Sequence, residues 1–439
     1  MTLGRRELLQ SGLVLRSKPI RGALALALLV PAFWAASAAP SRAVAAYAAA
    51  ARFREVGKIL VRGDNCLGAS LALDANGRII AAASSPCGGR YKDTVLVFRE
   101  PARGWGHRAR PVAVLSASPA DPAGELGDSD GLGPYGLAIS ADGSTIVAGD
   151  PLGSNGGGVY VFQEPSGGWH SETQSAYLHG TGPNDTSDGQ SALGGSVAVS
   201  ADGSVVLGYA GGFNSQLNYG LQYGAVNVYE RPAGGWGTAT GAFTAQLTTP
   251  AGHAVDEPQL GAPAISPDAS VIVAPAASSI LVYDEAPGGW GAGGGVDAAL
   301  ALPGPPSVVT FSPDGDSLLA STAQSGGSDT MYLLAAGTSG WNGAGVAATL
   351  SVKVPPVSGG GAFGDHVAYS GTAIAAFSDL SSTRIFEQPA SGWANASRTT
   401  QTLHPLPVSV ALSSSNELVL GGGPGAASNF GPGLLIFQR

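Results

Sequence analysis

The stretch Ser196–Ala210 reads SVAVSADGSVVLGYA, and its pattern decides the fold. Two short runs, Ser196–Ser200 and Val205–Ala210, flank the turn residues Ala201–Gly203. In the first run apolar residues alternate with small or polar ones, which is typical of a β-strand. The Asp-Gly pair favours a tight turn because such turns need a positive φ, which glycine adopts without strain. The stretch therefore predicts a β-hairpin.

The rest of the chain repeats this hairpin, adds a third run like V-Y-V-F after a variable loop, and usually closes with P-x-x-G-W. The seven copies of the first run lie at Ser70–Asp74, Gly136–Ser140, Ser196–Ser200, Ala262–Ser266, Val308–Ser312, His366–Ser370 and Ser409–Ser413. The third runs lie at Val95–Phe98, Val159–Phe162, Val226–Tyr229, Ile280–Tyr283, Met331–Leu334, Thr383–Phe386 and Leu434–Phe437. Glycine precedes a tryptophan in each of the first six copies, at Trp105, Trp169, Trp236, Trp290, Trp341 and Trp393. A fourth short run follows each Gly-Trp pair, for example Phe243–Leu247.

Four short strands repeated seven times predict an all-β fold, a seven-bladed β-propeller of four-stranded antiparallel blades in residues 52–439. The last copy ends after its third run, and Val56–Val61 (VGKILV) resembles the run that follows Gly-Trp elsewhere. Pairing of Val56–Val61 with Leu434–Phe437 would complete the last blade and leave no open sheet edge. We therefore expect an N-terminal strand to close the ring.

The composition agrees with one large repeat domain. Of the 439 residues, 67 are glycine, 30 are proline and only 12% are charged, while 44% are hydrophobic, which argues against disorder. Two cysteines are too few for a disulfide-dense scaffold or a four-ligand zinc cluster.

Residues 1–46 have the features of a signal peptide with an alanine-rich leader. Basic residues precede the apolar run Gly22–Val30, and Ala36–Ala38 supplies small residues for cleavage. We expect this segment to be removed, which leaves an exported protein, extracellular or in the cell envelope, with no membrane span. An uncleaved anchor is the alternative. The export route is either the general secretory route or the twin-arginine route, because Arg5 and Arg6 resemble part of a twin-arginine motif.

The repeats resemble those of the FG-GAP family, which form the N-terminal propeller of integrin α chains and of many secreted bacterial proteins. The resemblance rests on Phe363–Gly371 (FGDHVAYSG), Val147–Pro151 (VAGDP), Gly158–Phe162 (GVYVF) and Gly168-Trp169. It implies an extracellular module for adhesion or ligand binding. Many FG-GAP repeats hold calcium in a D-x-D-x-D-G hairpin, whereas these turns carry a single carboxylate, too few oxygens for calcium.

The propeller topology places the loops after each second and fourth strand on one face, here called the top face. Cys66 and Cys87 both fall on it, and in an exported protein we expect them to form a disulfide. Two free thiols are the alternative.

An acidic loop on the top face contains Asp121, Glu125, Asp128 and Asp130. Asp128 and Asp130 resemble half of a calcium loop that lacks the distal bidentate carboxylate. We therefore expect no cofactor, with a solvated acidic loop as the simpler interpretation and calcium as the alternative.

The longest loop after a second strand, Tyr209–Tyr223, interleaves aromatic rings with amides. Its rings belong to Tyr209, Phe213, Tyr219 and Tyr223. Rings supply contact area and amides supply direction, so the loop suits a carbohydrate or peptide ligand. The alternative is that these rings pack onto the blade as a cover.

Charge is uneven along the chain. Residues 52–110 hold 11 Lys or Arg and 5 Asp or Glu, whereas residues 111–438 hold 4 and 25. The basic first blade either orients the protein on an anionic surface or is balanced by acidic neighbours. The net negative charge that remains after removal of residues 1–46 argues against general nucleic-acid binding.

The sequence contains no G-x-S-x-G nucleophile motif and no phosphate-binding loop before a helix. We therefore predict a monomeric, non-catalytic binding or adhesion module for a protein or carbohydrate ligand. A polysaccharide hydrolase or lyase and a structural surface protein are the alternatives.

Overall fold

Strands occupy most of the part of the chain that the computed structural model describes. That part is residues 52–439 without 65, 85–90, 92, 107–108, 119–135, 152, 154–155, 181–191, 212–223, 250–261, 294, 323–329, 353–365, 378–381 and 424–429. The proposed leader, residues 1–46, lies outside the described residues.

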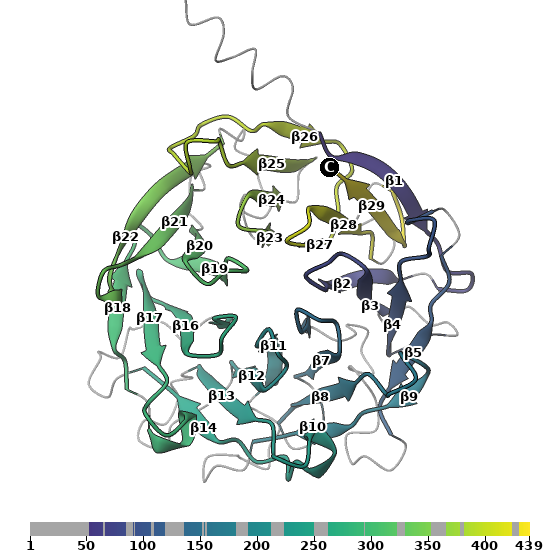
Figure 1. Ribbon diagram of the computed structural model, residues 1–439, viewed down its shortest axis with the longest axis horizontal. Helices are drawn as coiled ribbons and strands as arrows, with labels where there is room; N and C mark the ends of the chain where they lie inside the picture. The colour runs from purple at the N-terminus through teal and green to yellow at the C-terminus, as the bar shows by residue number, and fades with distance from the viewer. Residues whose placement is uncertain are drawn as a thin grey trace, which may run out of the picture. The chain divides into compact units, whose positions relative to one another are not determined.

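Seven sheets stand around a central opening, and their inner strands surround it (Figure 1). From the inside outward, blade 1 contains β2 (Leu67–Leu73), β3 (Ile79–Ser84), β4 (Thr94–Arg99) and β5 (Ala113–Ser116). Blade 2 contains β6 (Leu137–Ile139), β7 (Thr145–Asp150), β8 (Gly158–Gln163) and β10 (Ala176–Leu178). Blade 3 contains β11 (Leu193–Val199), β12 (Val205–Ala210), β13 (Ala225–Glu230) and β14 (Ala245–Leu247). Blade 4 contains β15 (Ala264–Ile265), β16 (Val271–Ala276), β17 (Ser279–Asp284) and β18 (Ala298–Ala301).

The remaining three blades have the same antiparallel order. Blade 5 contains β19 (Pro306–Phe311), β20 (Ser317–Thr322), β21 (Thr330–Gly337) and β22 (Gly340–Ser351). Blade 6 contains β23 (His366–Tyr369), β24 (Ala373–Phe377), β25 (Thr383–Glu387) and β26 (Gln401–Leu403). Blade 7 contains β27 (Ser409–Leu412), β28 (Glu417–Gly421), β29 (Leu434–Gln438) and β1 (Arg54–Ile59). A two-residue strand, β9 (Glu172–Thr173), adds to the outer edge of blade 1 in parallel.

The N-terminal strand closes the ring, as the sequence predicts. β1 pairs antiparallel with β29, with Ile59 opposite Leu434 and Arg54 opposite Gln438 (Figure 1). The register shifts once, between Glu55 and Gly57. The first and last strands of the ring therefore share one blade, and the outer edge of β29 is covered.

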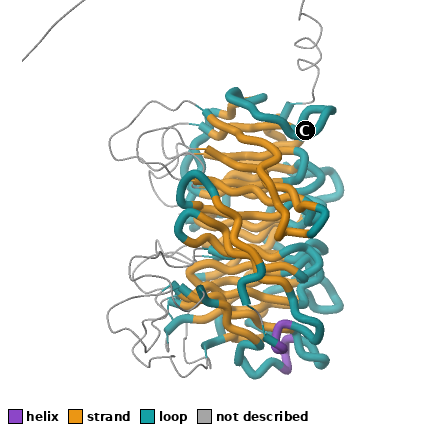
Figure 2. The backbone as a smooth tube through the Cα atoms, turned by 90° about the vertical axis from the view of Figure 1, so that its left-hand side faces the viewer, coloured by secondary structure: helices purple, strands orange, loops and turns teal. Residues whose placement is uncertain are grey.

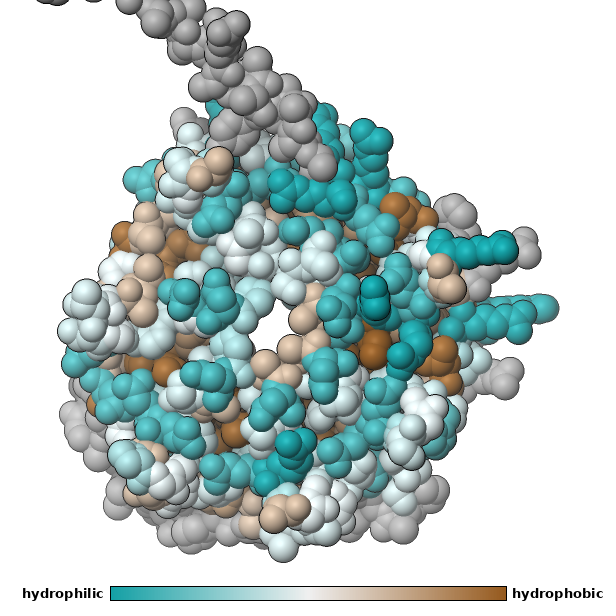
Figure 3. All heavy atoms as spheres, viewed as in Figure 1, coloured by the Kyte–Doolittle hydropathy of each residue, from teal (hydrophilic) through white to brown (hydrophobic). Residues whose placement is uncertain are grey.

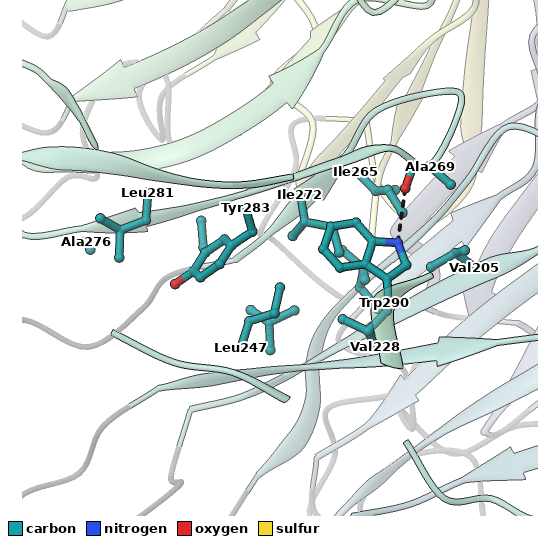
Figure 4. Close-up of a cluster of buried hydrophobic side chains, with 13 residues drawn as sticks. Val205, Val228, Leu247, Ile265, Ala269, Ile272, Ala276, Leu281, Tyr283 and Trp290 are labelled. Atoms are coloured by element: carbon teal, nitrogen blue, oxygen red, sulfur yellow. Dashed lines mark hydrogen bonds between the residues drawn. The ribbon is translucent and has the colours of Figure 1, made fainter. Parts of the chain in front are cut away.

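The hydrophobic core lies between neighbouring blades. One cluster joins Val205, Leu207 and Val228 of blade 3 to Ile272 and Trp290 of blade 4 (Figure 4). A second cluster joins blades 1 and 2 in the same way. Each sheet thus buries both faces against its neighbours, which is why strands such as β3 and β7 are buried along their whole length.

The Gly-Trp pair of most blades fastens the outer connection to the inner hairpin turn. The indole N–H donates to the carbonyl oxygen of a turn residue in the same blade over 2.9 to 3.1 Å. These bonds run from Trp105 to Gly77, from Trp169 to Gly143, from Trp236 to Gly203, from Trp290 to Ala269 and from Trp393 to Gly371. In blade 5, Trp341 instead packs edge-on against Phe311, with ring centroids 5.4 Å apart.

The indole bonds place the inner hairpin turns and the Gly-Trp closures on the same face, opposite the top face and here called the turn face. Two short 3₁₀ helices that begin at closure tryptophans, η1 (Trp236–Thr238) and η2 (Trp290–Ala292), lie on this face (Figure 2). In blade 2 the Ser140 hydroxyl donates to Asp142 and accepts the Thr145 N–H at 3.0 Å. Ser200, Ser266 and Ser312 make the equivalent bonds in blades 3, 4 and 5. The repeated serines therefore hold the turns.

Candidate functional site

Only part of the predicted aromatic site is described. Tyr209 lies near the end of β12, opposite Val226, and packs against the core cluster between blades 3 and 4. Burial raises the pKa of its phenol. Phe213, Tyr219 and Tyr223 lie outside the described residues. The contacts of Tyr209 are those of a ring that covers the blade, and a ligand-binding role for the loop stays a prediction.

The predicted disulfide and calcium residues are also described only in part. Cys66 is 1% exposed, and its N–H donates to Asp64 over 2.9 Å. Cys87, Asp128 and Asp130 lie outside the described residues, so the disulfide and the calcium alternative stay predictions. Within the described ranges, no three His, Cys, Asp or Glu side chains gather as a metal site would require.

Part of the basic first blade is paired with acidic residues. Arg99 of blade 1 bridges to Glu164 of blade 2, and Arg78 lies 3.8 Å from Glu100 in its own blade. Figure 3 shows hydrophilic side chains spread over the turn face around the central opening, without a single large apolar patch. The ion pair between Arg99 and Glu164 favours the interpretation that acidic neighbours balance the basic sector.

A cavity that the sequence did not predict opens on the turn face between blades 5 and 6. Its volume is about 560 Å³. The inner hairpin turns of both blades, the strands β21 and β22, and the Gly-Trp closure of blade 6 form its walls. The polar and aromatic lining includes Asp314, Asp316, Ser317, Tyr369, Gln388 and Trp393.

A shorter turn in blade 6 accounts for this cavity. Five residues, Ser312–Asp316, separate β19 from β20, whereas only Ser370–Thr372 separate β23 from β24. The Asp-Gly tip that projects from blades 2, 3 and 5 is therefore missing in blade 6. A bulge in β22 opposite Leu333 and Leu334 leaves Ala347 as the extra residue, and Ala347 lines the cavity.

Hydrogen bonds between the two blades hold the walls of the cavity in place. The Tyr369 hydroxyl lies 2.7 Å from the Ser317 hydroxyl of blade 5. Farther out, Thr349 of β22 donates its N–H to the Asn395 side chain over 2.8 Å, and Ala396 pairs with Leu350 in parallel. Because these hydrogen bonds fix blades 5 and 6 relative to each other, the shape of the cavity is preorganised.

The charge of the cavity comes from the blade 5 turn. Asp314 accepts bonds from the Ser312 hydroxyl and from the Asp316 N–H, as the turn aspartates of other blades do. Asp316, however, takes the place that serine occupies at Ser144, Ser204 and Ser270. Burial raises the pKa of Tyr369, and the nearby Asp314 carboxylate adds to this increase. The phenol therefore stays protonated at neutral pH.

The seven closed, four-stranded blades define the chain as a β-propeller. The sequence matches no protein-family model, and no curated protein resembles it in sequence. In the described part of the chain, no helix has the length and apolar character needed to cross a lipid bilayer.

Proposed function

We propose that this propeller is an exported, non-catalytic binding module that holds a protein or carbohydrate ligand on its top face. The contrast between its two faces supports this function. On the turn face the inner hairpin connections are short, and those of blades 2 to 5 use the same serine and aspartate bonds. On the top face the connection between β16 and β17 is Ala277–Ser278, whereas residues 211–224 connect β12 to β13 and residues 117–136 connect β5 to β6.

Variable connections on one rim of a rigid scaffold are where recognition usually resides. The faces of the blades are buried against one another. A ligand can therefore contact mainly the connections and the outer strands. The likeness of the repeats to FG-GAP units and the signal-like leader support adhesion or ligand capture outside the cytoplasm. Because propellers host many unrelated activities, the fold by itself does not select the ligand.

The binding proposal is tested by a glycan and peptide array probed with the purified protein and with a Tyr219→Ala, Tyr223→Ala double variant. We expect the wild type to bind a defined ligand and the double variant to bind it at least about tenfold more weakly, since aromatic contacts dominate such sites. Retained binding by the double variant would show that the blade 3 loop does not bind the ligand. Turnover of a bound glycan would favour the polysaccharide hydrolase or lyase, and the absence of any ligand would favour a structural protein.

A further inference from the structure

We infer that the cavity between blades 5 and 6 binds an organic cation carried on an alkyl chain, such as an alkylammonium or alkylguanidinium group. This goes beyond the proposed function because the cavity lies on the turn face, away from the top-face loops.

The first reason is the balance of charge around the cavity. Asp314 and Asp316 both line it and are exposed, and none of the described lining residues is basic. Asp314 already accepts two hydrogen bonds within its turn. Asp316 makes no ion pair or side-chain hydrogen bond in the described part of the chain, which leaves its carboxylate available to a ligand. Two carboxylates two residues apart attract a cation and repel an anion.

The second reason is the aromatic wall. Tyr369 and Trp393 lie edge to face, with ring centroids 6.2 Å apart and planes at 61°. The indole N–H of Trp393 is used by Gly371, so Trp393 offers its ring to the cavity. That ring is partly exposed, whereas Trp236 and Trp290 are 1% and 0% exposed. An aromatic ring beside carboxylates suits a cation, which is attracted to the face of the ring.

The third reason is the apolar part of the lining. Leu333 and Ala335 of β21 and Ala347 of β22 line the cavity, and Leu333 packs in the hydrophobic cluster between blades 5 and 6. A cation with an alkyl stem would place methylene groups on these side chains and its charged head near Asp316. A bare metal ion would leave this apolar surface unused, and a sugar would leave the two carboxylates without a counter-charge.

The ligand class is tested by titrating the purified protein with four small probes and following Kd by calorimetry. The probes are 1,5-diaminopentane, a blocked lysine peptide, the same peptide with an acetylated ε-amine, and methyl glucoside. We expect the first two to bind, the acetylated peptide to bind at least about tenfold more weakly, and binding of the cations to weaken as salt rises. Stronger binding of the blocked peptide would identify a partner's side chain as the source of the cation, and stronger binding of the diamine a free amine.

Variants separate the cavity from the rest of the molecule. Asp316→Ser introduces the residue that blades 2, 3 and 4 carry at this place, and we expect about threefold to tenfold weaker cation binding with unchanged thermal stability. Ser270→Asp places the same charge at the equivalent position of blade 4 and should not change cation binding. The Tyr219→Ala, Tyr223→Ala variant should also bind the cation normally. A failure of the top-face proposal can therefore be distinguished from a failure of the cavity inference. Equal binding of the acetylated peptide, preference for methyl glucoside, an unchanged Kd in Asp316→Ser, or no binding of either cation would overturn the inference.

Discussion

Trp290 donates its indole N–H to the carbonyl oxygen of Ala269 over 3.1 Å, and so joins the outer closure of blade 4 to its inner hairpin turn. The ring is fully buried between blades 3 and 4 (Figure 4). One side chain therefore satisfies a turn carbonyl and fills the interface with the preceding blade. This double role explains why Gly-Trp recurs with the same spacing as the turns.

Replacing Trp290 with phenylalanine should lower the free energy of unfolding by about 2–4 kcal/mol, because it removes both a buried hydrogen bond and ring volume. Trp341→Phe is the matched control, since Trp341 is also buried but makes no indole hydrogen bond in the described part of the chain. The loss of unfolding free energy in Trp341→Phe should be smaller than that in Trp290→Phe by about 1 kcal/mol. Chemical denaturation of both variants measures the difference, and equal losses would show that the hydrogen bond contributes nothing.

The stability cost of a substitution in or beside the closing strand β1 should depend on whether the side chain faces the core. Ile59 is fully buried in the cluster between blades 7 and 1, whereas its neighbour Leu60 is 59% exposed. We expect Ile59→Ala to cost about 2–5 kcal/mol and Leu60→Ala less than about 0.5 kcal/mol. Thermal melts of the two variants test this. Similar melting temperatures would mean that β1 does not seal the ring.

Gly149 should tolerate no side chain. A Cβ at this position would lie 1.9 Å from the carbonyl oxygen of Gly194 in blade 3, so the blades would have to separate. Gly149→Ala should therefore destabilise the protein by about 1–3 kcal/mol or more. At Gly106 a Cβ would meet nothing within 4 Å, and Gly106→Ala should be close to neutral. The prediction fails if both variants unfold at the same denaturant concentration.

The inner-turn aspartates with a lowered pKa, Asp142, Asp202 and Asp268, should make stability fall in acid. The hydrogen bond from Ser266 lowers the pKa of Asp268, with further bonds from Ser270. A carboxyl whose pKa is lower in the folded state stabilises the protein above its unfolded value of about 3.9 and loses this contribution as pH falls through the folded pKa. Asp268→Asn should therefore be less stable than the wild type at pH 7, and the gap should narrow below about pH 4. A gap that stays constant with pH would contradict this role for the carboxylate.

The local patterns of the sequence predict the strands because period-two alternation and Asp-Gly turns act within a few residues. β9 was not predicted, since two residues such as Glu172 and Thr173 carry no periodicity and pair only through the neighbouring blade. The cavity was also missed, because it depends on a short turn in one blade lying beside a normal turn in the next. The sequence does show the short turn Ser370–Thr372 and the aspartate at position 316. These features indicate a cavity only once blades 5 and 6 are known to be in contact.

We propose that this propeller binds a ligand without transforming it. The most direct measurement is an array of extracellular glycans and peptides probed with the purified protein, followed by mass spectrometry of every bound ligand after prolonged incubation. We expect a bound ligand that is recovered intact. A bound glycan recovered as cleaved fragments would contradict it.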